Sequence, residues 1–140
     1  TFHEYDHEDG AIDGVSVANK LGQDPAQVFK TLVTQGASKN FYVFVIPVAA
    51  ELDLKKAAKA VGEKSVAMLH VADLLKTTGY IRGGCSPVGM KKQFVTVIDS
   101  SAQDKPTVMV SAGRIGAQVE LAPADLARVT KARFESITFA

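Results

Sequence analysis

One segment of the chain combines residue types that could bind an oxygen-rich ligand. Residues 77–93, TTGYIRGGCSPVGMKKQ, contain four of the 11 glycines, the only cysteine and three basic side chains. Glycine lets a backbone approach a ligand closely, so the N–H groups of Gly84, Cys85 and Ser86 could donate to an acyl or phosphate oxygen. The same glycines would also suit a tight turn beside a solvated strand end. From the residues alone, both interpretations stay open.

Part of this segment, GCSPVGMK, comes close to the nucleotide-binding P-loop G-x-x-x-x-G-K-[ST]. However, Met90 separates Gly89 from Lys91, and no Ser or Thr follows the lysine to bind magnesium. Pro87 also removes one N–H group from the loop. The pattern therefore does not predict a nucleotide hydrolase.

Cys85 is a second candidate, as a nucleophile. A catalytic cysteine needs a base or a cationic setting that lowers its pKa, and the spacing of His3, His7 and His70 does not tell whether any of them approaches. A lone cysteine between glycine and serine is more typical of a small packing residue, so catalysis is the alternative. His3 and His7 would share one face of a strand and could bind a metal, but the sequence offers no evident third ligand.

Lys30 is a charged residue among apolar neighbours. In the segment VFKTLVT it shares one face of the expected strand with Val28 and Leu32. A polar or anionic ligand would explain a charge in this position, and so would a side chain that extends along the apolar surface to solvent. Together with the glycine-rich segment, Lys30 would suit an acyl or phosphate–sugar group.

Hydrophobic periodicity divides the chain into the elements that must position these residues. Strands are expected at 2–8, 28–34, 40–48, 65–69, 93–99, 106–113, 117–122 and 133–139, and helices at 14–22, 52–62, 71–79 and 123–132. Asp53 is placed to cap the second helix and Gly62 to end it. The expected inner face of that helix consists of Leu54, Ala57, Ala58 and Val61.

The arrangement of strands predicts the fold. Strand 40–48 hardly alternates, so it should be central and buried on both faces. The strands after residue 93 are joined by connections too short for a crossover helix, so they should be antiparallel. We expect an α+β fold with a mixed, largely antiparallel sheet curled into a barrel, helices flanking it, and a single domain over residues 1–140.

Composition excludes several classes of protein. One cysteine cannot form an internal disulfide and is compatible with a reducing cytoplasm. The longest apolar run, residues 41–50, is too short for a membrane-spanning helix and contains a proline. The net charge of +1 is far below that of proteins that bind nucleic acid through charge alone. We therefore expect a cytoplasmic protein without a membrane partner, whose contact with any polynucleotide is local.

Several motifs of the chain together resemble those of a known protein family. They are VFKTLV, VFVIPVAAELDLKKAAKAVG, TGYIRGGCSPVGMKK, VIDSSA, VMVSAGRIG and ELAPADL. In order and spacing the chain resembles, from about His3 to Phe134, the YbaK family of stand-alone Cys-tRNA(Pro) deacylases. These are similar to the editing insertion of bacterial prolyl-tRNA synthetases.

The resemblance implies an enzyme that hydrolyses the ester between a wrong amino acid and the 3′ adenosine of tRNA(Pro), without a metal or another cofactor. It implies that the thiol of a cysteinyl substrate assists cleavage, and that prolyl-tRNA synthetase is a possible partner in a ternary complex. Two alternatives stay open. One is a deacylase for Ala-tRNA(Pro) or another aminoacyl-tRNA, and the other is a non-catalytic module that binds tRNA or a synthetase.

The resemblance also assigns site residues. The essential lysine of the family falls on Lys30, and Gln118 stands where relatives carry an acid, seven residues after a conserved serine. In relatives the position of Cys85 often holds an apolar residue, which implies that the loop works through its backbone and not through a thiol. The remaining positions are Thr31, Ser111 and Tyr5 for substrate binding and the G-x-x-x-P loop Gly83, Gly84, Cys85, Ser86 and Pro87 for catalysis.

Overall fold

A computed structural model of the chain describes residues 2–4, 21–69, 94–111 and 117–139. Among these residues the strands are β1 (Phe2–Glu4), β2 (Phe29–Gly36), β3 (Phe41–Pro47), β4 (Val66–Met68), β5 (Val95–Asp99), β6 (Val108–Ser111), β7 (Ala117–Leu121) and β8 (Arg133–Glu135). The helices are α2 (Leu54–Val61) and α4 (Pro123–Thr130), with short 3-10 helices η1 (Pro25–Gln27) and η2 (Ser100–Asp104). The α+β class is therefore confirmed.

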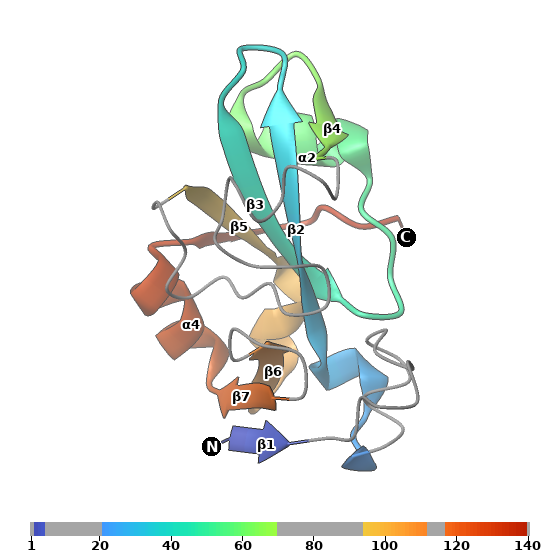
Figure 1. Ribbon diagram of the computed structural model, residues 1–140, viewed down its shortest axis with the longest axis vertical. Helices are drawn as coiled ribbons and strands as arrows, with labels where there is room; N and C mark the ends of the chain where they lie inside the picture. The colour runs from blue at the N-terminus through green and yellow to red at the C-terminus, as the bar shows by residue number, and fades with distance from the viewer. Residues whose placement is uncertain (1, 5–20, 70–93, 112–116, 140) are drawn as a thin grey trace.

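A five-stranded sheet in the order β4-β2-β3-β5-β8 forms the larger part of the structure (Figure 1). Strands β2 and β3 are antiparallel, whereas β5 runs parallel to both β3 and β8. The central position predicted for 40–48 is confirmed, because residues 42–46 of β3 are all buried. Val43 and Val45 pack on one side of the sheet, and Phe44 and Ile46 pack on the other.

A smaller antiparallel sheet in the order β1-β7-β6 lies at one end of the molecule, opposite the end that carries α2 and β4 (Figure 1). One parallel bridge, between Val28 and Met109, connects β6 to the residue before β2. Val28, Met109 and Val48 pack together at this bridge. The start of β2 therefore belongs structurally to both sheets.

The expected barrel is not confirmed, since the described strands form two sheets and neither closes on itself. The prediction that the strands after residue 93 are antiparallel is confirmed for β6 and β7 and is wrong for β5. Between β5 and β6 the chain turns through η2, which leaves the larger sheet. Asp99 holds this turn, because its side chain accepts from the Ser101 N–H at 3.2 Å and from the Ile137 N–H at 3.1 Å.

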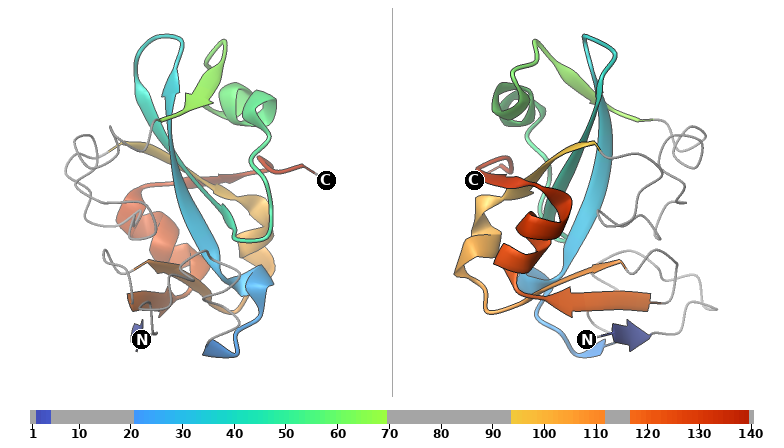
Figure 2. Two further views of the ribbon diagram at one scale, coloured as in Figure 1. Left: turned by 45° about the vertical axis from the view of Figure 1, so that its right-hand side comes forward. Right: turned by 90° about the vertical axis from the view of Figure 1, so that its left-hand side faces the viewer.

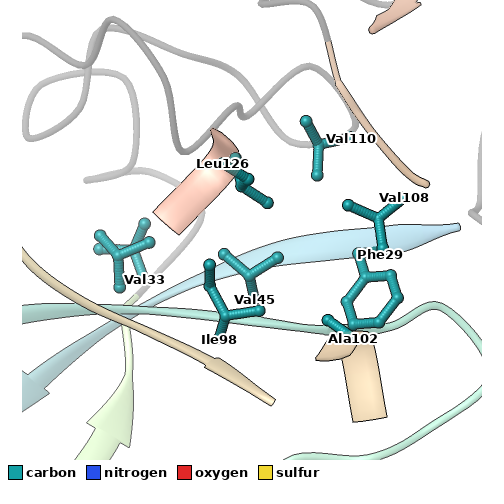
Figure 3. Packing of buried hydrophobic residues seen from close by; sticks show 9 residues of the cluster. Phe29, Val33, Val45, Ile98, Ala102, Val108, Val110 and Leu126 are labelled. Carbon is teal, nitrogen blue, oxygen red and sulfur yellow. The ribbon is translucent and has the colours of Figure 1, made fainter. Parts of the chain in front are cut away.

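The main hydrophobic core lies between the larger sheet, α4 and β6 (Figure 3). Its buried members include Phe29, Val33, Val45, Ile98, Val108, Val110 and Leu126. The two views of Figure 2 show α4 and η2 side by side below the C-terminal segment. A second core lies on the other face of the larger sheet, where α2 contributes Ala57 and Ala58.

The residues predicted to cap and to end helix α2 are confirmed, and its predicted inner face is confirmed in part. Asp53 caps α2 by accepting from the N–H groups of Lys55 and Lys56 at 3.0 and 3.3 Å, and Gly62 ends the helix with a left-handed φ of 71°. Leu54, expected on the inner face, is instead 39% exposed at the first position of the helix. Within the described residues, no helix is long and apolar enough to cross a membrane.

Other predictions fall partly or wholly outside the described residues. Strand β1 confirms the first part of the strand expected at 2–8. The expected helix at 71–79 and the glycine-rich segment 77–93 lie outside them, as does most of the expected helix at 14–22. The edge strand expected near the C-terminal end is confirmed as β8, which pairs only with β5 among the described strands.

Candidate active site

Lys30 lies on β2, directly opposite Ile46 of β3, and its side chain is half-buried. Alternation along the strand places it on the same face as Val28 and Leu32, as predicted. No hydrogen bond or ion pair to Lys30 is formed within the described part of the chain. Lys30 is thus a half-buried lysine on an apolar face that has no partner among the described residues.

The parallel bridge between Val28 and Met109 brings Ser111 to the same face as Lys30. Two residues that pair across adjacent strands have their side chains on the same side of the sheet. In a parallel pair both strands run in the same direction, so residues two positions further along each strand also lie on that side. Lys30 lies two residues after Val28, and Ser111 lies two residues after Met109. The bridge thus places two of the predicted site residues, which are 81 positions apart in the sequence, on the same face of neighbouring strands.

Gln118 extends this face into β7, because it pairs directly with Ser111 of β6. It is only 4% exposed, and its Oε1 atom has no hydrogen-bond partner among the described residues. The neighbouring pair, Val110 and Val119, points the other way, toward the main core (Figure 3 shows Val110). A buried amide oxygen without a partner is costly, so this atom is a candidate to accept a hydrogen bond from a ligand.

His3 on β1 pairs with Gln118 from the opposite side and completes the row. We call His3, Gln118, Ser111 and Lys30 the polar row; it crosses β1, β7, β6 and β2 on one face. Hydrogen-bonded neighbouring strands lie about 4.8 Å apart, so His3, Gln118 and Ser111 extend over about 10 Å, and Lys30 follows across the bridge between Val28 and Met109. This length suits an extended small group rather than a single ion.

A carboxylate holds the imidazole of His3. Its Nε2 atom lies 2.7 Å from Oε1 of Glu120, and Oε2 of Glu120 accepts from the Thr107 hydroxyl at 2.6 Å. The hydrogen bond from Thr107 and then that from His3 lower the pKa of Glu120, so the carboxylate is ionised at neutral pH. Sequence reasoning missed Glu120; its position two residues after Gln118 on an alternating strand was the available signal.

Thr31, predicted beside Lys30, lies on the opposite face of β2. It pairs with Val45, whose side chain belongs to the main core. Its Oγ1 atom is buried without a hydrogen-bond partner in the described part of the chain. The structure therefore separates the Thr31 side chain from the polar row, and a role in substrate binding stays a prediction.

The remaining predicted site residues, Tyr5 and the loop Gly83, Gly84, Cys85, Ser86 and Pro87, lie outside the described residues. The described residues hold no group of three His, Cys, Asp or Glu side chains suited to a metal ion, and His7, considered with His3 as a metal ligand, lies outside them.

Comparison with known proteins relates this geometry to a family. The model of the family described as the aminoacyl-tRNA editing domain matches residues 11–129. The chain belongs to this family. The matched range includes Lys30, Ser111 and Gln118 of the editing domain, whereas His3 precedes it.

A curated relative and two solved structures extend the comparison. EbsC of Enterococcus faecalis (strain ATCC 700802 / V583) is 50% identical over 136 residues, which are 97% of this chain and 83% of the relative. Its name gives it, provisionally, as a Cys-tRNA(Pro)/Cys-tRNA(Cys) deacylase.

Both solved structures share the fold of this editing domain. One, described provisionally as a trans-editing enzyme for prolyl tRNA synthetase, superposes with a TM-score of 0.89 at 24% identity and covers 100% of this chain and 87% of its own. The other, from work on epitope grafting onto scaffold proteins, has a TM-score of 0.88 at 25% identity and covers 100% and 86%.

Proposed function

We propose that the chain is a trans-editing deacylase that removes cysteine from mischarged Cys-tRNA(Pro). The observation that carries this proposal is the 50% identity, over 97% of the chain, to a relative named for this activity. Membership of the aminoacyl-tRNA editing family supports the same reaction class. In this proposal residues 1–140 act as one editing domain, free-standing from any synthetase.

The proposed reaction is needed because the binding pocket of a synthetase discriminates poorly between proline and cysteine. Proline and cysteine are close in size, and a binding pocket separates such ligands only by factors on the order of ten to a few hundred. Hydrolysis at a second site removes the wrong product after it has formed. A small domain with a polar row on one face has the dimensions for the 3′ end of the tRNA and does not need to enclose the whole molecule.

In the proposed mechanism Lys30 binds the terminal phosphate or the ribose and holds the ester along the polar row. Its half-buried ammonium, unpaired within the described residues, supports this role. Backbone N–H groups of the loop Gly83–Pro87 would stabilise the oxyanion, as the sequence resemblance implies. The thiol of the cysteinyl group would attack its own ester carbonyl, so the protein itself need supply no nucleophile.

We further propose that prolyl-tRNA synthetase supplies much of the selectivity for the tRNA body, in a ternary complex in the cytoplasm. The net charge of +1 supports this proposal, because 15 acidic side chains nearly balance the 16 lysines and arginines and so weaken the attraction of the chain for phosphates beyond the site.

Single-turnover deacylation under saturating enzyme tests the proposal. The substrates are Cys-tRNA(Pro), Cys-tRNA(Cys), Ala-tRNA(Pro) and Pro-tRNA(Pro), each compared with its rate without enzyme. We expect fast release of cysteine and no acceleration with Pro-tRNA(Pro). Preference for Ala-tRNA(Pro) would replace the substrate within the same reaction class, and binding without deacylation of any substrate would refute the enzyme assignment.

A further inference from the structure

The pair of His3 and Glu120 resembles the arrangement of an acid–base residue and the group that orients it. A general base must have a free lone pair, and a carboxylate on the other ring nitrogen fixes which nitrogen carries it. The Nε2 atom of His3 lies 2.7 Å from the ionised Glu120 carboxylate, so in the neutral imidazole Nε2 carries the proton and Nδ1 carries the lone pair. No hydrogen bond to Nδ1 is formed within the described residues.

Glu120 is itself held in place. The Thr107 hydroxyl donates to its second oxygen at 2.6 Å, and the Thr107 carbonyl accepts from the Gln27 amide at 3.2 Å. This chain of hydrogen bonds joins β7, the approach to β6, and η1, which immediately precedes the strand of Lys30. The imidazole therefore has a defined orientation relative to the polar row.

His3 is also accessible and lies in the polar row. Its side chain is 30% exposed, and its direct strand partner is Gln118, which in turn pairs with Ser111. Glu120 of β7 is the titratable group that contacts His3 among the described residues. The approach to β6 and η1 contribute the uncharged Thr107 and Gln27 to the same network. The imidazole of His3 is therefore partly open to solvent at one end of the polar row.

We propose that His3 is the proton acceptor for the thiol of the cysteinyl substrate and that Glu120 positions it. The inference rests on the proposed function. A free thiol has a pKa of about 8.5, so only about 3% of it is the reactive thiolate at pH 7. A base in hydrogen-bond reach removes this limit, and general bases typically contribute about 100-fold or more to a rate.

The step balances without another reactant. Nδ1 of His3 takes the proton from the substrate Sγ–H while the sulfur bonds to the ester carbonyl carbon. The bond between that carbon and the 3′ oxygen then breaks, and the proton passes from Nδ1 to the departing 3′ oxygen. The products are a tRNA with a free 3′ hydroxyl and the four-membered thiolactone of cysteine, which water opens to cysteine.

The dependence of the rate on pH distinguishes this role from a structural one. His3→Gln should lower the single-turnover rate with Cys-tRNA(Pro) about 30-fold at pH 7, in line with the fraction of thiolate. The difference from wild type should shrink to well under about twofold at pH 9, where about three quarters of the substrate thiol ionises unaided. Uncatalysed ester hydrolysis is measured at each pH and subtracted. Glu120→Gln should give an intermediate loss with the same convergence.

Two controls complete the experiment. Glu4→Gln changes the neighbouring residue on the other face of β1 and should leave the rate at wild-type level at both pH values. With Ser-tRNA(Pro) the His3→Gln defect should not shrink at pH 9, because the hydroxyl stays protonated. An active wild type combined with a His3→Gln defect that is equal at pH 7 and pH 9 would overturn the inference and leave the deacylase assignment standing. An inactive wild type would instead reject the deacylase.

Discussion

At the scale of single residues, Lys30 is the positive charge of the polar row, and its loss should separate activity from stability. Lys30→Ala should lower kcat/KM for Cys-tRNA(Pro) by about 100-fold, because the ammonium aligns and stabilises the reacting end of the substrate. The fold should persist, since the side chain is only half-buried. Deacylation assays with thermal unfolding of the same protein check both statements. Lys55→Ala, which removes an exposed lysine of α2, is the matched control, and wild-type rates for Lys30→Ala would contradict the assignment.

Substitution of Gln118 should also lower activity without lowering stability. Gln118→Leu removes an amide oxygen that is buried without a partner among the described residues, so the free energy of unfolding should rise or stay within about 1 kcal/mol of wild type. If the oxygen accepts a hydrogen bond from the substrate, kcat/KM should fall by about tenfold. Gln118→Glu keeps the shape and the acceptor and should retain more activity than Gln118→Leu. A destabilised but fully active Gln118→Leu protein would show that the amide serves the fold.

At the scale of elements, Glu63 ties the end of α2 to the hairpin of β2 and β3. Its carboxylate accepts hydrogen bonds from the Ser38 hydroxyl, from the Ser38 N–H at 3.3 Å and from the Tyr42 hydroxyl at 2.5 Å. The hydrogen bond from the Ser38 side chain, and then that from Tyr42, lower the pKa of Glu63 below its usual value. Glu63 in turn raises the pKa of Tyr42.

This contact should make stability depend on pH in a defined direction. A carboxyl group whose pKa is lower in the folded state stabilises the fold above its unfolded pKa, and the contribution is lost as the pH falls through the folded value. Glu63→Gln should therefore have a lower Tm than wild type at pH 7, and the difference should disappear near pH 3. Glu51→Gln, at an exposed position, is the control. An equal difference at pH 7 and pH 3 would show that the charge of Glu63 is not the cause.

The contact between Glu63 and the hairpin of β2 and β3 can also be tested by a substitution in the hairpin, at Gly36. A Cβ atom added to Gly36 would collide with the carboxyl end of Glu63. Gly36→Ala should therefore lower Tm in the wild-type background and much less in a Glu63→Ala background, because the two substitutions act on one contact. If the decreases in Tm from the two substitutions simply added in the double variant, the contact with Glu63 would not be the cause of the Gly36→Ala effect.

Sequence reasoning predicted elements well where the signal is local. Asp53 and Gly62 delimit α2, and Pro123 begins α4, because capping and the missing proline N–H act within one turn. The pairing of β5 and the gathering of Lys30 with Ser111 depend instead on residues far apart in the chain. Strand neighbours are chosen by packing of the whole sheet, so η2 could redirect the chain without any periodic signal. The family resemblance named Lys30 and Ser111, but only the strand register places them with Gln118.

At the scale of the whole molecule, a net charge of +1 limits how tightly tRNA can be held. About three phosphate contacts, at about −0.7 per contact, predict a slope of about −2 in a plot of log affinity against log salt concentration. Binding of tRNA(Pro) by the isolated protein, measured over a range of salt concentrations, tests this expectation. A slope several times steeper, together with tight and selective binding, would mean that the protein recognises the tRNA body without a synthetase.

Because β1 pairs with β7, the candidate site can form only late in the synthesis of the chain. His3 leaves the ribosome among the first residues described here, yet its partners Gln118 and Glu120 follow more than a hundred residues later. Because a strand of three residues has little stability by itself, β1 must wait without its partner while the larger sheet forms. A nascent chain that has not yet released β7 therefore lacks Gln118 of the polar row and Glu120, which holds His3, and deacylation can begin only after nearly the whole domain has emerged.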